Sequence, residues 1–382
     1  MQYRQFGKLD WKASALGFGA MRLPVVDNEQ ANIDEPEAIR MIRYAIDHGV
    51  NYLDTAYPYH GGNSERVVGR ALKDGYREKM KLATKMPVRM VESAKDFDRI
   101  FSEQLERLQT DKIDFYLLHG LNSRSWPKAR DMGVLHWAEE KMAAGRFDYL
   151  GFSFHDELDA FKEIVDAYDW TMCQVQYNYM DIETQAGREG VEYAADKGLA
   201  IVVMEPLRGG KLGKQPEPVM KVWDSAPQKR SPAEWALLWV LDQPAASVAL
   251  SGMSTMEQVV ENVTVTSRSA PGMLTDEELA LYDRVREAYR GLSPIPCTSC
   301  GYCLPCPNGV EISRNFEIYN NATMYDDMRV GRFYYRGGRI EEEQRADQCT
   351  ECGECLDACP QEIPIPEWLT KVHETLGPRP AQ

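Results

Sequence analysis

The sequence has almost no cysteine over most of its length, and this absence narrows the class of protein. Cys173 is the single cysteine before residue 297. Small secreted proteins carry disulfides throughout the chain, so this distribution argues against that class. No apolar run approaches the roughly 20 residues that span a bilayer, and the first residues show no signal-peptide pattern. We therefore expect a cytoplasmic protein without a membrane partner.

The chain also lacks an excess of basic residues. Its 44 Lys and Arg against 59 Asp and Glu give a net charge of −15, which argues against nucleic acid as a partner. The composition is otherwise ordinary for a globular protein, with 43% hydrophobic and 27% charged residues. At about 150 residues per domain, the 382 residues suggest two or three domains, or one large barrel with a smaller module.

Short apolar runs alternate with amphipathic stretches over roughly the first 260 residues. One such stretch places Phe97, Ile100, Phe101, Leu105 and Leu108 on a single helical face. The expected strands lie in segments 15–21, 51–56, 81–86, 112–119, 149–154, 173–180, 199–206 and 247–253. Eight strands that are each followed by a helix are typical of a TIM (β/α)8 barrel. A doubly wound sheet is the rival, but residues 17–22 do not supply the GxGxxG fingerprint expected after its first strand.

Polar residues follow three successive expected strands. Asp54 and Tyr59 follow the second strand, Lys85 ends the third and His119 ends the fourth. The chemistry of a TIM barrel lies at the carboxyl ends of its strands. Each residue alone could be a turn cap or an ordinary surface residue, but the set of four indicates an active site.

This set resembles the catalytic tetrad of the aldo-keto reductase superfamily over roughly residues 1–290. The resemblance implies that Tyr59 protonates a carbonyl oxygen while NAD(P)H delivers hydride to the carbon. It also implies that Lys85 and Asp54 pair beside Tyr59 and that His119 orients the carbonyl. An ammonium about 4 Å from the phenol is worth roughly 4 kcal/mol at an effective dielectric of 20. Such an ammonium would lower the pKa of Tyr59 by up to about three units.

The same resemblance implies a nicotinamide cofactor site that matches the family less completely. Met204 stands where many members have a tyrosine that stacks on the nicotinamide. The asparagine that usually follows the serine is Phe154 here, after Ser153, and His155 comes next. Gly252 and Gln258 replace the Lys and Arg that grip a 2′-phosphate, which leaves open NADH or NADPH. The implied cofactor residues are Gly19, Ala20, Met21, Ser153, Gln174, Met204, Pro206, Leu207, Arg208, Lys211, Gly252, Ser254, Gln258, Glu261 and Asn262.

The other eight cysteines form two runs near the end of the chain. The first run is Cys297, Cys300, Cys303 and Cys306, and the second is Cys349, Cys352, Cys355 and Cys359. The second has the C-x2-C-x2-C-x3-C-P spacing of bacterial 4Fe–4S ferredoxins, and the first is one residue shorter before its last cysteine. Zinc ribbons are the alternative, because they pair two CxxC knuckles around one ion.

Two 4Fe–4S clusters fit three close cysteines followed by Cys-Pro better than zinc does. In two-cluster ferredoxins the fourth cysteine of each run serves the other cluster. This rule assigns Cys359 to the cluster held by Cys297, Cys300 and Cys303. It assigns Cys306 to the cluster held by Cys349, Cys352 and Cys355. Segment 312–329 between the runs indicates a helix, so the tail resembles helical ferredoxin modules. The whole chain resembles the aldo-keto reductase class that carries such a tail.

A helix expected over 274–291 and the linker 293–296 set the predicted domains. These are an aldo-keto reductase-like barrel over 1–291 and a 4Fe–4S domain over 292–382. We expect a reductase of a small carbonyl substrate, an aldehyde, ketone or sugar-like compound. Alternatives are a reductase fed through the clusters by a ferredoxin or flavoprotein, and a non-catalytic electron-transfer subunit. Candidate substrate contacts are Arg22 after the first strand, with Arg124 and Trp126 after His119.

Overall fold

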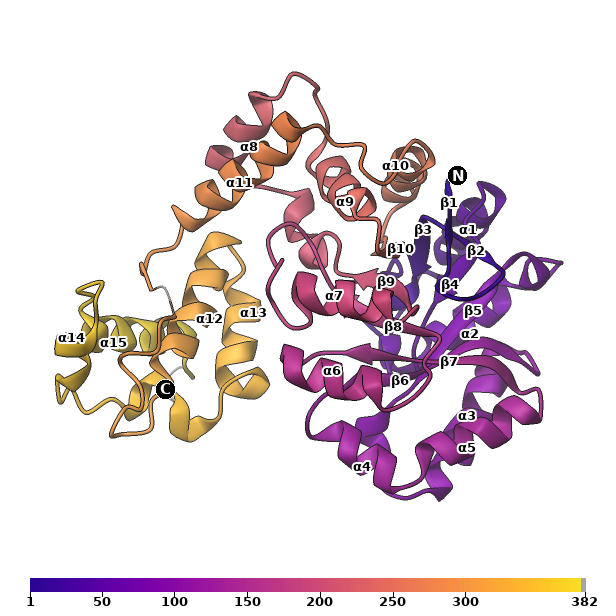
Figure 1. The fold of residues 1–382 in the computed structure, drawn as a ribbon, viewed down its shortest axis with the longest axis horizontal. Helices are drawn as coiled ribbons and strands as arrows, with labels where there is room; N and C mark the ends of the chain where they lie inside the picture. Colours follow the sequence, from indigo (N-terminus) through magenta and orange to yellow (C-terminus); the bar gives the residue numbers. More distant parts are fainter. Residues whose placement is uncertain (298, 379–382) are drawn as a thin grey trace. The chain divides into compact units, whose positions relative to one another are not determined.

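The computed structural model describes residues 1–297 and 299–378. Eight parallel strands close into a barrel in the order β10-β3-β4-β5-β6-β7-β8-β9, and helices surround them (Figure 1). The TIM-barrel prediction is therefore confirmed. The barrel strands are β3 (Leu16–Gly19), β4 (Tyr52–Asp54), β5 (Lys81–Met86), β6 (Ile113–Leu121), β7 (Phe147–Phe154), β8 (Met172–Gln176), β9 (Ala200–Met204) and β10 (Ala246–Gly252).

The strands are apolar on both faces because helices cover the outside and side chains fill the inside. Helix α3 shows the outer layer, since all five residues of its predicted apolar face are buried. The helices of this unit are α1 (Glu35–Asp47), α2 (Ser64–Ala71), α3 (Lys95–Leu108), α4 (Ser125–Asp131), α5 (Val134–Ala143), α6 (Leu158–Asp166), α7 (Gly187–Asp196), α9 (Pro232–Asp242) and α10 (Met256–Ser267).

A hairpin that the sequence did not indicate closes the amino-terminal end of the barrel. Its strands β1 (Tyr3–Gln5) and β2 (Lys12–Ser14) pair antiparallel. Phe6, in the connection between them, is fully buried, and its ring centroid lies 4.9 Å from that of Phe115 inside the barrel. This packing leaves the carboxyl ends of the strands as the open end.

The chain divides into two compact units that interleave in sequence. The first comprises Met1–Lys214 and Arg230–Asp276, and the second comprises Gln215–Lys229 and Glu277–Gln382. The predicted boundary at 291/292 stays a prediction, but this division places the preceding helix in the second unit. The helices of the second unit are α8 (Glu217–Asp224), α11 (Asp276–Arg290), α12 (Ile312–Met324), α13 (Met328–Phe333), α14 (Glu354–Ala358) and α15 (Ile365–Leu376).

The second unit is helical around its own small core. Phe316 on α12 and Leu369 on α15 belong to one buried cluster, and cysteines of both runs pack against it. Helix α12 confirms the helix expected between the cysteine runs. In the part of the chain that the structure describes, no helix has the length and apolar character that crossing a bilayer requires.

Candidate active site and cluster sites

The four predicted catalytic residues meet at the carboxyl ends of neighbouring strands. Asp54 is the last residue of β4, Lys85 lies in β5 and His119 lies in β6. Tyr59 begins the short helical turn Tyr59–Gly62 after β4. Pairing of Asp54 with Ala83 and of Lys85 with Leu117 places these side chains at the same end of the barrel.

Lys85 and Asp54 form an ion pair that is closed off from solvent. Their side chains are only 1% and 2% exposed. The Nζ of Lys85 donates to Oδ1 of Asp54 and, at 2.8 Å, to the carbonyl oxygen of Thr55. Burial on its own would lower the pKa of Lys85, but Asp54 and Tyr59 together outweigh burial and hold this pKa above its usual value. The lysine is therefore a fixed positive charge.

Tyr59 lies between this charge and His119. The Nζ of Lys85 is 5.1 Å from the centre of the phenol ring. The rings of Tyr59 and His119 are 5.8 Å apart and nearly perpendicular, at 85°. Both residues are partly exposed, so a substrate that enters the open end of the barrel can reach them.

The pKa values of Tyr59 and His119 depend on burial as well as on the neighbouring charges. Burial raises the pKa of Tyr59, and the opposing charge of Lys85 does not cancel that rise. The expected lowering of this pKa was therefore wrong, because desolvation of the phenolate outweighs the ammonium. Burial, with the positive charges of Lys85, His155 and Arg89, lowers the pKa of His119 to about 3. Near neutral pH the site thus presents a protonated phenol and a neutral imidazole.

Gln174, a predicted cofactor residue, is hydrogen-bonded to the ion pair. Its Nε2 donates to Oδ2 of Asp54 at 2.5 Å and to the hydroxyl of Tyr52 at 3.2 Å. Its Oε1 is buried and accepts no hydrogen bond from the described residues. Ser153, also buried, accepts a 2.8 Å hydrogen bond from the backbone N–H of Gly120. An unused buried acceptor beside a hydroxyl suits the carboxamide of a nicotinamide ring.

The loop after β9 carries the predicted pyrophosphate residues. Met204 is the last residue of β9, and Pro206 and Leu207 lead into the turn Arg208–Gly213. Gly209 and Gly210 have φ values of +68° and +93°, which favour glycine. Lys211 lies in the same turn, and Arg208 pairs with Asp181 at 3.0 Å. A pyrophosphate that binds Arg208 would therefore have to compete with the Asp181 carboxylate.

Arg22 lies against this loop. A Cβ added to Gly252 would come within 3.1 Å of Cγ of Arg22, and one added to Gly209 within 3.1 Å of its guanidinium. The stem of Arg22 therefore covers the position where a side chain at 252 would begin. These contacts place the guanidinium of Arg22 beside the predicted phosphate loop, and its role as a substrate contact stays a prediction. Gly19, Ala20 and Met21 precede it at the end of β3.

The predicted adenosine residues form hydrogen bonds with one another and with neighbouring residues. Gln258 accepts from the backbone N–H of Ser254 at 2.7 Å, and the Ser254 hydroxyl donates to the carbonyl of Arg22 at 2.9 Å. Glu261 accepts from Ser231, and Asn262 donates to Ser251 at 3.0 Å. None of these contacts adds a cation to the two positions where the sequence lacks one.

The two substrate candidates after His119 lie in different settings. Trp126 is 1% exposed, and its ring packs against Trp170 at 5.9 Å. The prediction that Trp126 forms an apolar wall for substrate was therefore wrong, because it lies in the core. Arg124 is exposed, and its charge contributes to the lowered pKa of Asp156. Sequence reasoning missed Arg89, although its position four residues after Lys85 was a usable signal.

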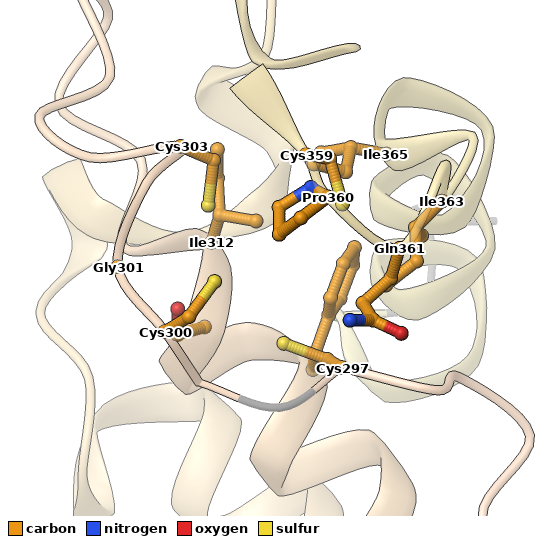
Figure 2. Close-up of a pocket in the computed structure, with 12 residues that line it drawn as sticks. Cys297, Cys300, Gly301, Cys303, Ile312, Cys359, Pro360, Gln361, Ile363 and Ile365 are labelled. Carbon is orange, nitrogen blue, oxygen red and sulfur yellow. The ribbon is translucent and has the colours of Figure 1, made fainter. Parts of the chain in front are cut away.

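The cysteines of the second unit line two cavities. Cys297, Cys300, Cys303 and Cys359 line the first. Figure 2 shows their thiols directed into one shared space, with Ile312, Ile363 and Ile365 around it. Three thiols from one run and one from the other, in a mainly apolar wall, are the donor set that a cubane iron–sulfur cluster requires.

The second cavity has the complementary composition. Cys306 lines it together with Cys349, Cys352 and Cys355, and Cys303 also reaches it. Its wall is more polar and includes Asn308, whose Nδ2 lies 4.0 Å from the sulfur of Cys352. The residues at both cavities therefore fit clusters with crossed fourth ligands.

Comparison with known proteins agrees with this architecture. The model of the aldo/keto reductase family matches residues 15–287. The chain belongs to the aldo/keto reductase family. A 4Fe-4S dicluster domain matches residues 296–363. The second match covers both cysteine runs, so this aldo-keto reductase carries an iron–sulfur domain, as predicted.

Characterised relatives are similar over the barrel. The NADH-specific methylglyoxal reductase of Escherichia coli is 26% identical over 327 residues, covering 74% of this chain and 97% of that protein. The L-galactose dehydrogenase of Arabidopsis thaliana is 28% identical over 319 residues, covering 77% and 97%. Their different substrates show that this level of similarity establishes the oxidoreductase class but not the compound reduced.

A solved structure has the same fold. The holo form of aldo-keto reductase AKR11C1 from Bacillus halodurans superposes with a TM-score of 0.63 at 29% identity, covering 75% of this chain and 96% of that one. An aldo-keto reductase from Klebsiella pneumoniae in complex with NADPH has a TM-score of 0.60 at 23% identity, which is evidence for the fold alone.

Proposed function

We propose that this aldo-keto reductase reduces a small aldehyde or ketone with NADH or NADPH as the hydride donor. The observation that carries the proposal is the buried Lys85–Asp54 pair beside Tyr59, with His119 across the open end of the barrel. The set joins a proton donor, a fixed positive charge and a hydrogen-bond donor at one point, which is what carbonyl reduction requires.

The proposed roles follow from protonation states. A phenol whose pKa is raised by burial keeps its proton until the carbonyl oxygen gains negative charge, so Tyr59 gives up its proton at that moment. Lys85 stabilises the resulting phenolate, and Asp54 keeps the lysine charged. His119, neutral because its pKa is about 3, donates a hydrogen bond to the same carbonyl oxygen. When bound, the nicotinamide supplies the hydride that the carbonyl carbon receives.

For the cofactor we propose the predicted residues together with Arg22. The unused Oε1 of Gln174 and the hydroxyl of Ser153 would hold the carboxamide. Lys211 and the glycine turn would hold the pyrophosphate, with Arg22 beside them. Because Gly252 and Gln258 offer no cation, binding of a 2′-phosphate would depend on Ser254, on backbone N–H groups and on Arg22.

Replacing Tyr59 by phenylalanine tests the catalytic part. Tyr59→Phe should lower kcat for carbonyl reduction by about 10²–10⁴-fold and leave dinucleotide binding nearly unchanged. Tyr57→Phe is the matched control, because the Tyr57 hydroxyl donates to Glu103 at 2.6 Å and not to the proposed site. Turnover of Tyr59→Phe close to that of the unmodified protein would refute the assignment.

Titration with NADH and NADPH tests the cofactor part. We expect measurable binding of at least one dinucleotide, monitored by protein fluorescence, and weaker binding of both in Arg22→Ala. If neither dinucleotide bound to the cluster-containing protein, the nicotinamide proposal would fail. A non-catalytic electron-transfer subunit would then be the better interpretation.

In a second candidate function, the clusters pass electrons between a partner protein and the barrel site. Cys300 and Cys352, one in each cavity, are exposed, so clusters held there would reach the surface where a ferredoxin or flavoprotein could exchange electrons. A hydride carries two electrons, whereas each cluster normally passes one. Anaerobic mixing of NADPH with the oxidised protein tests the link. Cluster reduction seen by electron paramagnetic resonance would favour this candidate, and unchanged clusters would favour an independent or structural role.

A further inference from the structure

Arg89 is a cation at the open end of the barrel that the proposed catalytic and cofactor sites do not use. Strand β5, which carries Lys85, ends at Met86, and Arg89 lies in the turn Val88–Met90 directly beyond it. The side chain is exposed. Within the described part of the chain no carboxylate pairs with it, and segment 86–91 contains no acidic residue.

His155 approaches the same place from another strand. It follows the last residue of β7, and its backbone N–H donates to the carbonyl of Leu121, two residues after His119, at 3.2 Å. Its ring Nδ1 lies 3.2 Å from Oε1 of Gln185, which holds the imidazole at the rim. His155 and Arg89 are both close enough to His119 for their charge to lower its pKa.

Two carboxylates at this end of the barrel have hydrogen-bond partners. Asp54 is buried and bound to Lys85 and Gln174. Asp156 accepts from the backbone N–H of Ser123 at 2.7 Å. Lys85 is balanced by Asp54, so the added positive charge at the proposed carbonyl position comes from Arg89, with the His155 imidazole at the rim, and such a setting favours an anionic substrate.

We propose that Arg89 binds a carboxylate of the substrate, and that the substrates of this enzyme are small oxo acids. Arginine suits this role because its planar fork of N–H donors matches a carboxylate. His155 would add a hydrogen bond from the other side of the rim. The inference rests on the proposed reductase function and names its substrate class.

Matched acids and esters test the proposal in the full chain purified with its clusters. The unmodified protein should reduce pyruvate or succinic semialdehyde with higher kcat/KM than the corresponding methyl ester. Arg89→Ala should lower kcat/KM for the acid by about ten- to a hundredfold, the usual worth of a hydrogen bond to a charged group, and change that for the ester less than threefold. Arg89→Lys should recover part of the loss, and Arg130→Ala, an exposed arginine on α4 paired with Asp131, is the control.

A binding measurement separates this proposal from the reductase function. Oxamate, an unreactive analogue of an oxo acid, should bind the protein saturated with NADP⁺ or NAD⁺, with Kd about tenfold or more higher in Arg89→Ala. Equal losses on acid and ester, or unchanged oxamate affinity in Arg89→Ala, would overturn the oxo-acid proposal and leave the reductase function standing. Absence of carbonyl reduction despite Arg89-dependent oxamate binding would instead contradict the reductase function alone.

Discussion

The barrel site and the cysteine cavities differ in how far the polypeptide alone completes them. At the barrel, Lys85 and Gln174 donate hydrogen bonds to the two carboxylate oxygens of Asp54. In the cavities, the thiols line spaces that no group of the described residues fills, as Figure 2 shows for the first one. Cys297 and Cys349 accept hydrogen bonds from backbone N–H groups at 3.5 and 3.4 Å. The comparison indicates that the catalytic residues are organised by folding, whereas the second unit needs its inorganic groups to be complete.

Removal of iron should therefore affect the two units very differently. We expect chelation under reducing conditions to unfold much of the second unit, because its small core packs directly against the cysteines. The barrel should keep its structure. Amide hydrogen exchange would show lost protection in α12 and α15 and retained protection in β5 and β6. Equal protection of α12 and α15 with and without iron would contradict the comparison.

Single and double cysteine replacements should identify which cysteines bind each cluster. Cys306→Ser should remove one cluster and about half of the iron. Adding Cys352→Ser should remove little more, because both residues line the second cavity. Adding Cys300→Ser, which lines the first cavity, should remove nearly all remaining iron. The reverse pattern in iron and sulfide counts would show that Cys306 serves its own run.

Breaking the buried ion pair should destabilise the barrel without any change in iron content. Lys85→Met leaves Asp54 buried without its cation, which typically costs about 3–5 kcal/mol of unfolding free energy. Asp54→Leu combined with Lys85→Met should lie closer to the unmodified protein than Lys85→Met alone, since no unpaired charge remains. Denaturant titration followed by tryptophan fluorescence measures both. A negligible effect of Lys85→Met would mean that the pair is not organised by folding.

The smallest expected effect is that of pH on His119. Its pKa of about 3 lies below the ordinary value of about 6.5, so the ring stays neutral in the folded protein. The unfolded chain binds the extra proton, so this group costs stability as pH falls from about 6.5 toward 3. Between pH 5.5 and 8, kcat/KM should show no inflection from His119. An inflection near 6.5 that disappears in His119→Asn would contradict this.

Sequence patterns predicted the barrel and the cysteine cavities because each has a strict spacing. Apolar runs fixed all eight barrel strands, and the Cys-Pro spacing anticipated that Cys359 joins the first cavity. The hairpin at the barrel base escaped because each of its strands is three residues long. Such short strands carry no readable alternation.

The predictions that were wrong concern the pKa of Tyr59 and the placement of Trp126, which depend on the residues that surround each side chain in the folded protein. Burial, which raises the pKa of Tyr59, and the packing of Trp126 against Trp170 arise from residues distant in sequence. The position of Arg22 against Gly209 and Gly252, on which the sequence was silent, also depends on segments that meet only in the folded barrel.

The interleaving of the two units limits how the iron–sulfur module could be gained or lost. Residues 215–229 lie within the barrel sequence but belong to the second unit, where Trp223 of α8 packs on Tyr282 of α11 at 5.1 Å. A stop codon after residue 291 would discard the cysteines yet leave this helix pair behind, with surface that the rest of its unit no longer covers. Transplanting the module onto another reductase would therefore require two grafts, one internal and one terminal.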